Sequence, residues 1–309
     1  MPQSFGDRLA RQVVKRSSQL VLGLDPDPMR LWPRATELAA ARAGGHPVSS
    51  AARAARAVSA HCELAMDAAG EHCVAVKLQV ACFERLGPPG WAALWEVCDR
   101  ARERELLVIA DAKRGDVAIT AAAYAQAFLG ETPTPFGTVA GLGADALTVN
   151  PLLGQDSLLA LVETARQRGR GLFVLVRTSN PGAADVQALA LAEGGTVSER
   201  LAAMVAELGS GCVGAAGLAD VGAVVGATAP AALEILRQAM PCSVFLLPGV
   251  GAQGGRVEDL APAFAPGPAG GLIAVSRGIV DAYERTGMDP ALAAEREAAR
   301  LRELAWKLA

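Results

Sequence analysis

Eight short apolar runs recur along the chain, and each ends in polar residues or in Gly and Pro. Most are apolar throughout rather than alternating with polar residues, which is typical of strands covered on both faces in a parallel sheet. We therefore predict eight buried parallel strands. The runs begin at Leu20, Cys73, Leu106, Ala146, Gly171, Val221, Ser243 and Gly271.

The segments between these runs have the periodicity of helices. Residues 51–70, 90–105 and 156–171 place apolar side chains at helical spacing. The first of these helices should end at Gly70, a candidate C-terminal cap, and the second should carry Trp91 and Trp95 on its apolar stripe. Alternating strands and helices predict a (β/α)8 TIM barrel, with an open doubly wound sheet as the competing fold.

The whole chain, residues 1–309, is expected to form a single TIM-barrel domain, because α/β barrels reach this length as one unit. Residues 27–50, 181–200 and 255–270 exceed what a minimal barrel needs and should form loops or added helices. The last segment is predicted to be an amphipathic helix that packs outside the barrel through Leu301, Leu304, Ala305 and Leu308.

Composition excludes several classes of function. A net charge of −3 lacks the basic excess that nucleic-acid binding requires. The six cysteines have no metal-ligand spacing and are expected to be reduced thiols of a cytoplasmic protein. The N-terminus shows no leader pattern, and there is no run of 18 apolar residues, so neither secretion nor membrane spanning is expected.

One strand ends in an unusual group of charges, in the sequence LLVIADAKRGD. Residues two apart in a strand face the same way, so Asp111 and Lys113 should share one face, with Arg114 on the other. Asp116 follows after Gly115, which permits a turn. In barrels, the C-terminal ends of the strands carry the chemistry, so the shared face should look into a ligand cavity.

Neighbouring strands add Lys77 and Asp25 at the same end of the predicted barrel. A rim of structural ion pairs is the alternative explanation, since charged residues are common at strand ends. Three strands ending in acid or lysine at the catalytic face favour a functional cluster instead. No metal ion is needed there, because each carboxylate has a lysine close by.

A glycine-rich segment ends the seventh predicted strand, in the sequence PGVGAQGG. The eighth strand ends in VSRGI, which presents Arg277 beside Gly278. Barrels often bind phosphate with the loops after these two strands, where backbone N–H groups approach the anion and an arginine adds a bidentate cation. The sequence therefore predicts a phosphate ester as substrate.

Four motifs in order give the chain a family resemblance. DAKRGD matches the pattern Asp-x-Lys-x-x-Asp, and VKLQ, TSNPGA and PGVGAQGG accompany it. From Leu20 to Ile279 the chain resembles the orotidine 5'-phosphate decarboxylases, in the longer bacterial form called type 2. The resemblance implies decarboxylation of orotidine 5'-phosphate to uridine 5'-phosphate, the last step of de novo pyrimidine biosynthesis, without a cofactor and in a homodimer.

The resemblance also implies catalytic roles. Lys113 would donate a proton to carbon 6 of the pyrimidine, and Asp111 would lie against the departing carboxylate. Lys77 would contact the ribose. Asp116 and Thr120 would reach across the dimer interface into the partner's site, so that each dimer has two shared sites.

The remaining expected residues bind the substrate. Asp25 would hold a ribose hydroxyl, Ser179 the amide edge of the pyrimidine, and Pro248 would line the base pocket. Asn150 should help to shape the pocket, and residues 181–200 or 252–258 could close over it. The group expected around the phosphate comprises Gln253, Gly254, Ser276, Arg277 and Gly278.

Three other functions compete with this interpretation. Metal-dependent sugar-phosphate decarboxylases and hexulose-phosphate synthases share the barrel and the Asp-x-Lys-x-x-Asp strand, but they need magnesium and typically replace the Arg-Gly pair that is present here. An aldolase would use Lys113 or Lys77 as a Schiff-base amine, although neighbouring carboxylates raise lysine pKa values. A phosphate-ligand binding protein would not need the charged cluster.

Histidine is left out of the expected mechanism. His46, His61 and His72 do not fall at the C-terminal ends of predicted strands. Each is expected to be a surface or packed side chain rather than a catalytic base.

Overall fold

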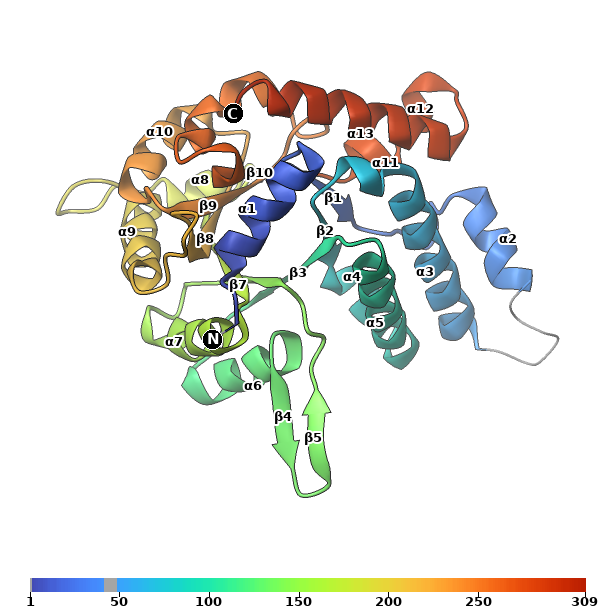
Figure 1. Ribbon diagram of the computed structural model, residues 1–309, viewed down its shortest axis with the longest axis horizontal. Helices are drawn as coiled ribbons and strands as arrows, with labels where there is room; N and C mark the ends of the chain where they lie inside the picture. The colour runs from blue at the N-terminus through green and yellow to red at the C-terminus, as the bar shows by residue number, and fades with distance from the viewer. Residues whose placement is uncertain (1, 42–48) are drawn as a thin grey trace.

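The computed structural model describes residues 2–41 and 49–309, and its centre is a closed barrel of eight parallel strands (Figure 1). The closed order is β1-β10-β9-β8-β7-β6-β3-β2. Each predicted apolar run forms one of these strands, so the TIM-barrel prediction is confirmed and the open sheet is wrong. The strands are β1 (Leu20–Leu24), β2 (Ala75–Gln79), β3 (Leu107–Arg114), β6 (Ala146–Val149), β7 (Gly171–Arg177), β8 (Ala219–Val225), β9 (Ser243–Pro248) and β10 (Gly271–Val275).

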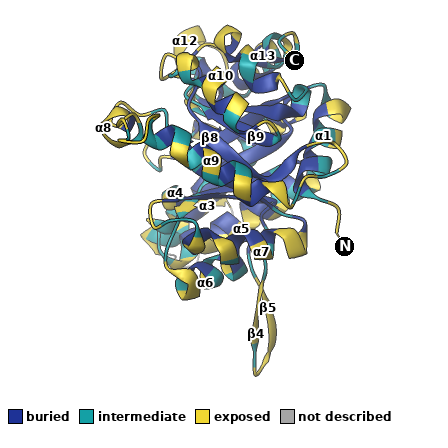
Figure 2. Ribbon diagram, turned by 90° about the vertical axis from the view of Figure 1, so that its left-hand side faces the viewer, coloured by how far each residue is buried: buried dark blue, intermediate teal, exposed yellow. Residues whose placement is uncertain are grey.

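Helices surround the barrel and bury its outer face. In Figure 2 the barrel strands are mostly coloured as buried, whereas the helices around them carry both buried and exposed residues. The buried apolar side chains of strands and helices form one large core between the two layers. The predicted helices at 51–70, 90–105 and 156–171 are present, as α3, α5 and α7. The outer helices are α3 (Ser50–Ala69), α5 (Pro88–Glu103), α6 (Ala118–Phe128), α7 (Asp156–Arg168), α9 (Val197–Ser210), α10 (Pro230–Ala239) and α13 (Pro290–Trp306).

The C-terminal helix α13 packs as predicted. Leu301 and Ala305 are buried, and Leu304 and Leu308 are partly buried against the same core. Gly70 is the C-cap of α3, as predicted, and its N–H donates a hydrogen bond to the Met66 oxygen. Its φ of −64° is right-handed, and the chain continues into the short 3-10 helix η1 (Gly70–His72). One detail of the helix predictions is wrong, because Trp91 and Trp95 of α5 remain partly exposed.

The three long segments contain short helices, as expected. Residues 27–50 include α2 (Pro33–Ala41), and residues 42–48, with His46, lie outside the described residues. Residues 181–200 include α8 (Ala183–Gln187). Between β9 and β10, two 3-10 helices take the place of an α-helix, because Pro262 interrupts the segment. They are η2 (Val257–Phe264) and η3 (Pro268–Gly270), and the other short helices are α4 (Val80–Glu84), α11 (Arg277–Val280) and α12 (Ala282–Thr286).

An antiparallel hairpin projects from the barrel between α6 and β6 (Figure 1). It consists of β4 (Glu131–Thr134) and β5 (Gly137–Ala140), and Phe136 at its tip is fully exposed. The sequence analysis did not predict this hairpin. Pro133 lies within β4, and proline within an apolar run argues against a strand unless the strand is at an edge.

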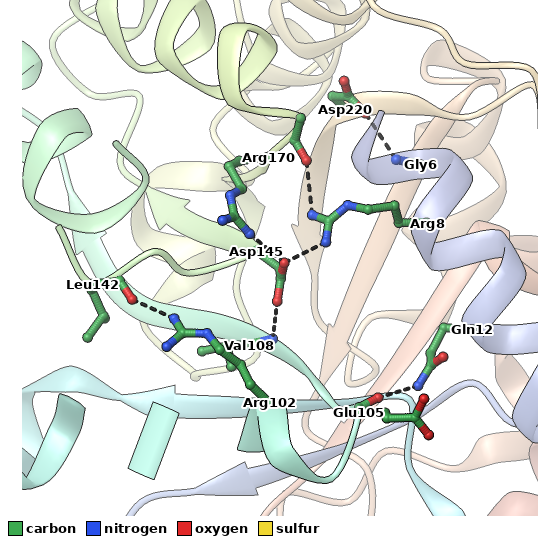
Figure 3. A network of polar contacts seen from close by, with 11 residues as sticks. Gly6, Arg8, Gln12, Arg102, Glu105, Val108, Leu142, Asp145, Arg170 and Asp220 are labelled. Atoms are coloured by element: carbon green, nitrogen blue, oxygen red, sulfur yellow. Dashed lines mark hydrogen bonds and ion pairs between the residues drawn. The ribbon is translucent and has the colours of Figure 1, made fainter. Parts of the chain in front are cut away.

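The N-terminal helix α1 (Phe5–Arg16) closes one end of the barrel. Phe5, Leu9 and Val13 pack against inward-facing side chains of the strands, and this second core fills the N-terminal end. Asp145, just before β6, fixes α1 in place, since its Oδ1 accepts hydrogen bonds from Arg8 at 2.7 Å and from Arg170 at 2.6 Å (Figure 3). The helix α1 thus occupies the N-terminal end of the barrel, and a cavity opens at the opposite, C-terminal mouth.

Candidate active site

A cavity of about 520 Å³ opens at the C-terminal mouth of the barrel. Its walls come from strand ends and the loops that follow them. Apolar side chains from four strands, Leu175, Val224, Leu246 and Ala274, contribute to its lining. Ten of the fourteen site residues expected from the sequence line it: Asp25, Lys77, Asp111, Lys113, Ser179, Pro248, Gln253, Ser276, Arg277 and Gly278.

Four of these residues form a continuous chain of alternating charges, Asp25–Lys77–Asp111–Lys113, which we call the charge chain. Lys77 Nζ lies 3.6 Å from Asp25 Oδ1 and 2.6 Å from Asp111 Oδ2. Lys113 Nζ lies 2.6 Å from Asp111 Oδ1. Lys77 and Asp111 are buried, whereas the Lys113 side chain is 44% exposed, so its ammonium is accessible to a molecule in the cavity.

The two buried members of the charge chain, Lys77 and Asp111, stay ionised because neighbouring charges stabilise them. Burial alone would raise the pKa of Asp111, but Lys77 and Lys113 outweigh it and hold the pKa well below the ordinary value of 3.8. Burial alone would lower the pKa of Lys77, but Asp111 and Asp25 outweigh it and raise the pKa above the ordinary value of 10.5. A fixed positive charge therefore lies on each side of the Asp111 carboxylate.

The end of β3 is irregular, and this irregularity brings Asp111 and Lys113 into the cavity. Ala110 pairs with Leu147 of β6 and Arg114 pairs with Val149, so the residues between them bulge out of register. Lys113 takes a left-handed backbone conformation with φ of 51°. Arg114 faces outward, as expected, where it pairs with Glu84.

Glycine is needed at position 115 because the backbone of Asn150 lies very close to it, and not because the chain turns there. A Cβ atom at this position would lie 2.5 Å from the backbone oxygen of Asn150. Asn150 is not among the residues that line the cavity, contrary to the expectation. Its backbone packs behind Gly115, and its side-chain Oδ1 accepts a hydrogen bond from the Leu152 N–H at 3.0 Å.

Asp116 and Thr120 also lie outside the lining of the cavity. Asp116 is half-buried beyond the end of β3, where its Oδ1 accepts a hydrogen bond from the Val117 N–H at 2.7 Å. Thr120 lies on the first turn of α6. Within one chain, neither residue belongs to the cavity that contains the charge chain.

The glycine-rich loop after β9 forms a tight turn on another side of the cavity. Gly249, Gly251 and Gly254 have φ angles of 103°, 75° and 88°, which side chains rarely adopt. The Gly251 N–H donates to the Gly255 oxygen at 2.9 Å and closes the turn. Gly254 does not line the cavity, but Gln253 does, together with Arg277 from the end of β10.

Ser179 lies on the side of the cavity formed by the loop after β7. Its position is constrained by glycines, because a Cβ atom at Gly226 would lie 2.8 Å from the Ser179 Cα, and one at Gly249 would lie 3.0 Å from its Cβ. Both segments expected to close over a ligand contribute to the lining, through Gly182, Ala183, Val186 and Gln187 and through Ala252 and Gln253.

The sequence analysis assigned no role to several polar residues of the cavity. Gln79 follows Lys77 by two positions on the same strand face, a spacing that could have identified it, and its Nε2 lies 3.3 Å from Asp111 Oδ2. Thr148 is buried opposite the irregular end of β3. Thr178 and Asn180 belong to the TSNPGA motif, but no role was assigned to them.

The two described histidines lie away from the cavity, as expected. His61 is buried, its Nδ1 accepts a hydrogen bond from the Trp32 N–H at 3.1 Å, and burial lowers its pKa to about 4. His72, the last residue of η1, is also buried. Within residues 2–41 and 49–309, no group of three or more His, Cys, Asp or Glu side chains is placed to hold a metal ion. The same residues include no helix that is long and apolar enough to span a membrane.

The closed barrel, with a lysine–aspartate cluster and a glycine-rich loop at its C-terminal mouth, defines a (β/α)8-barrel protein with the architecture of an enzyme. Residues 18–288 match the family described as the orotidine 5'-phosphate decarboxylase / HUMPS family, and the chain belongs to this family. The resemblance found in the motifs is thereby confirmed, while its type 2 assignment stays a prediction.

Named relatives support the family. The chain is 48% identical over 235 residues to the orotidine 5'-phosphate decarboxylase of Deinococcus radiodurans, covering 76% of this chain and 79% of the relative. It is 37% identical over 281 residues to that of Caldicellulosiruptor bescii, covering 91% and 90%. The structure of Leishmania donovani OMP decarboxylase superposes with a TM-score of 0.70 at 31% identity, covering 98% of this chain and 99% of the other.

Proposed function

We propose that this protein decarboxylates orotidine 5'-phosphate to uridine 5'-phosphate and carbon dioxide. The observation that carries the proposal is the charge chain, in which Asp111 lies between Lys77 and Lys113 at one side of a cavity whose lining also includes Gln253 and Arg277. Family membership and the relatives named as orotidine 5'-phosphate decarboxylases support the same reaction.

The reaction requires fixed positive charge at a ring carbon. When the bond to the carboxylate breaks, its electron pair stays on carbon 6 of the pyrimidine, which has no conventional electron sink. Lys113 would stabilise this charge more in the transition state than in the ground state and would then transfer a proton from Nζ to carbon 6. Its exposed ammonium, 2.6 Å from Asp111, supports this role.

Asp111 would hold Lys113 in place and lie against the substrate carboxylate. The repulsion between the two carboxylates would end when carbon dioxide leaves. Because Lys77 and Lys113 keep the pKa of Asp111 low, it would remain ionised beside the substrate. Lys77, 3.6 Å from Asp25, would contact the ribose while Asp25 accepts a hydrogen bond from a ribose hydroxyl.

Binding at a distance from carbon 6 would position the ring. Gln253 and Arg277 would hold the phosphate, with Ser276 and Gly278 beside them, and Ser179 would contact the amide edge of the base next to Pro248. Closure of residues 181–200 or 252–258 over the substrate would exclude water from the cavity. The free energy of phosphate binding would drive this closure and so lower the barrier to reaction at the base.

The environment of Asp111 favours this reaction over the metal-dependent reactions of the same barrel. Its Oδ2 contacts Lys77 and Gln79, and its Oδ1 contacts Lys113 and Thr148. Both oxygens thus already have cationic or hydrogen-bonding partners, so we propose that the protein works without a metal ion or other cofactor.

We further propose a homodimer with shared sites, in which Asp116 and Thr120 reach the partner's cavity. Apolar side chains lie exposed next to these two residues in the sequence and on the segment after β6, whose Asn150 packs against Gly115, which supports a contact surface there. Ile119 is 88% exposed and Leu152 is 80% exposed, and Val117 and Leu153 are also exposed.

We propose in addition that the protein is cytoplasmic. All six cysteines are free, which supports this location.

The decisive test follows orotidine 5'-phosphate by absorbance in the presence of a chelator, with uridine 5'-phosphate and carbon dioxide identified as products. We expect turnover that the chelator does not reduce. A hexulose 6-phosphate serves as the control substrate, and we expect no reaction with it. Absence of turnover with orotidine 5'-phosphate, or turnover that requires added magnesium, would refute the proposal.

A further inference from the structure

The buried hydroxyl of Thr148 occupies an unusual place next to the charge chain. Thr148 lies in the middle of β6, is 1% exposed, and is one of the residues lining the cavity. Pairing between β3 and β6 stops at Ala110 and resumes at Arg114, so Asp111, Ala112 and Lys113 all stand opposite this one residue. The regular hydrogen bonds of a parallel ladder are therefore interrupted at this point.

The Thr148 side chain replaces the missing ladder contacts. Its Oγ1 accepts a hydrogen bond from the Lys113 N–H at 2.9 Å and donates one to Asp111 Oδ1 at 2.9 Å. A hydroxyl has a single proton to donate, so its orientation is set by these two partners. The same atom thus binds the backbone of one reacting residue and the carboxylate of the other.

The first of these contacts stabilises a strained conformation. Lys113 has φ of 51°, and a residue other than glycine keeps this conformation only where the surroundings hold it. The hydrogen bond that Thr148 Oγ1 accepts comes from the N–H of Lys113, the residue with the strained backbone. Without the hydroxyl, the Lys113 N–H would lose this hydrogen bond. The backbone of Lys113 could then relax to a regular strand conformation, and its side chain would point in another direction.

We propose that Thr148 is a positioning residue, whose hydroxyl fixes the bulge at the end of β3 and thereby sets the distance between Asp111 and the Lys113 ammonium. Its only proton is used on Asp111, so it acts through that pair rather than by donating to the substrate. This inference rests on the proposed decarboxylation, because its effect is on the step at carbon 6 and not on phosphate or ribose binding.

The test compares Thr148→Val, which keeps the shape and removes the hydroxyl, with Thr148→Ser, which keeps the hydroxyl. We expect kcat for orotidine 5'-phosphate to fall about 10- to 100-fold in Thr148→Val, as for loss of a hydrogen bond to a charged group. KM and the Kd for uridine 5'-phosphate should change less than about threefold, and Thr148→Ser should recover most of kcat.

Two further variants keep the inference testable. Thr148→Ala removes both the hydroxyl and the methyl group and places no apolar group beside Asp111. If Thr148→Val does not fold, Thr148→Ala should show the same loss of kcat. Ser59→Ala removes another buried hydroxyl, which donates to Glu96 at 2.8 Å between α3 and α5, and should leave kcat unchanged. If the wild type shows no turnover, the proposed function fails. If it is active and a folded Thr148→Val or Thr148→Ala keeps full kcat, or Thr148→Ser loses as much, the role of Thr148 is refuted.

Discussion

Asp111 is the residue on which the electrostatics of the cavity depend. Its carboxylate is buried, yet Lys77, Lys113, Gln79 and Thr148 together provide it with cationic and hydrogen-bonding partners. A buried charge is tolerated only when it is paired and hydrogen-bonded, and removal of one partner leaves the others uncompensated. We therefore expect the contacts that are proposed for catalysis to contribute to stability as well.

Asp111→Asn should reduce stability in a way that depends on pH. The folded protein holds the pKa of Asp111 below its ordinary value of 3.8, so the carboxylate stabilises the fold above about pH 4 and loses this effect as the pH falls through the lowered pKa. We expect the free energy of unfolding to drop by about 3 kcal/mol near neutral pH, with a smaller difference in strong acid.

Urea unfolding at several pH values would measure this dependence. Asp99→Asn is a suitable control, because Asp99 forms an exposed ion pair with Arg102 at 2.6 Å and its loss should cost less than about 1 kcal/mol. An Asp111→Asn protein as stable as the wild type near neutral pH would show that the carboxylate does not stabilise the fold.

Two elements shape the cavity through their backbones: the bulged end of β3 and the loop after β9. Neither is regular, and in each case a conformation with positive φ, at Lys113 or at the loop glycines, determines where side chains point. The glycine-rich loop was identifiable from the sequence because glycine alone adopts such angles freely. The bulge was not, because it depends on pairing with Thr148 in a strand 35 residues away.

Gly251→Ala and Gly217→Ala form a matched pair that tests the loop. Both glycines have nearly the same φ, 75° and 76°, and neither has an atom within 4 Å of an added Cβ. Each substitution should therefore cost about 1 kcal/mol in stability through backbone strain. Only Gly251→Ala should raise KM for orotidine 5'-phosphate, by roughly tenfold, because the strain there alters the loop that is proposed to hold the phosphate. Equal KM values in the two variants would show that the loop does not bind the phosphate.

At the scale of the whole molecule, the apolar runs predicted the barrel because parallel strands covered on both faces are apolar throughout. The convergence of Asp25, Lys77, Asp111 and Lys113 followed from their places at strand ends. The β4–β5 hairpin pairs residues that are close in the sequence, but Pro133 within β4 argues against a strand there. The closure of the barrel by α1 depends on contacts between distant segments. No local pattern in the sequence signals such contacts.

The proposed shared sites make a prediction about mixtures of inactive subunits. If Asp116 of one subunit completes the site that contains Lys113 of the other, Lys113→Ala and Asp116→Ala should each be inactive alone. Refolding them together should restore about a quarter of wild-type activity, since half of the dimers are mixed and each has one intact site. Activity no greater than the sum of the separate variants would contradict shared sites.

The most direct test of the central claim is kcat for orotidine 5'-phosphate in Lys113→Ala beside the wild type, with the Kd for uridine 5'-phosphate measured in both. Removal of the fixed charge and the proton donor should lower kcat by at least about a thousandfold. The Kd should change little, because the residues expected to hold the phosphate, Gln253 and Arg277, are untouched. A Lys113→Ala protein that keeps a kcat within tenfold of the wild type would contradict the account.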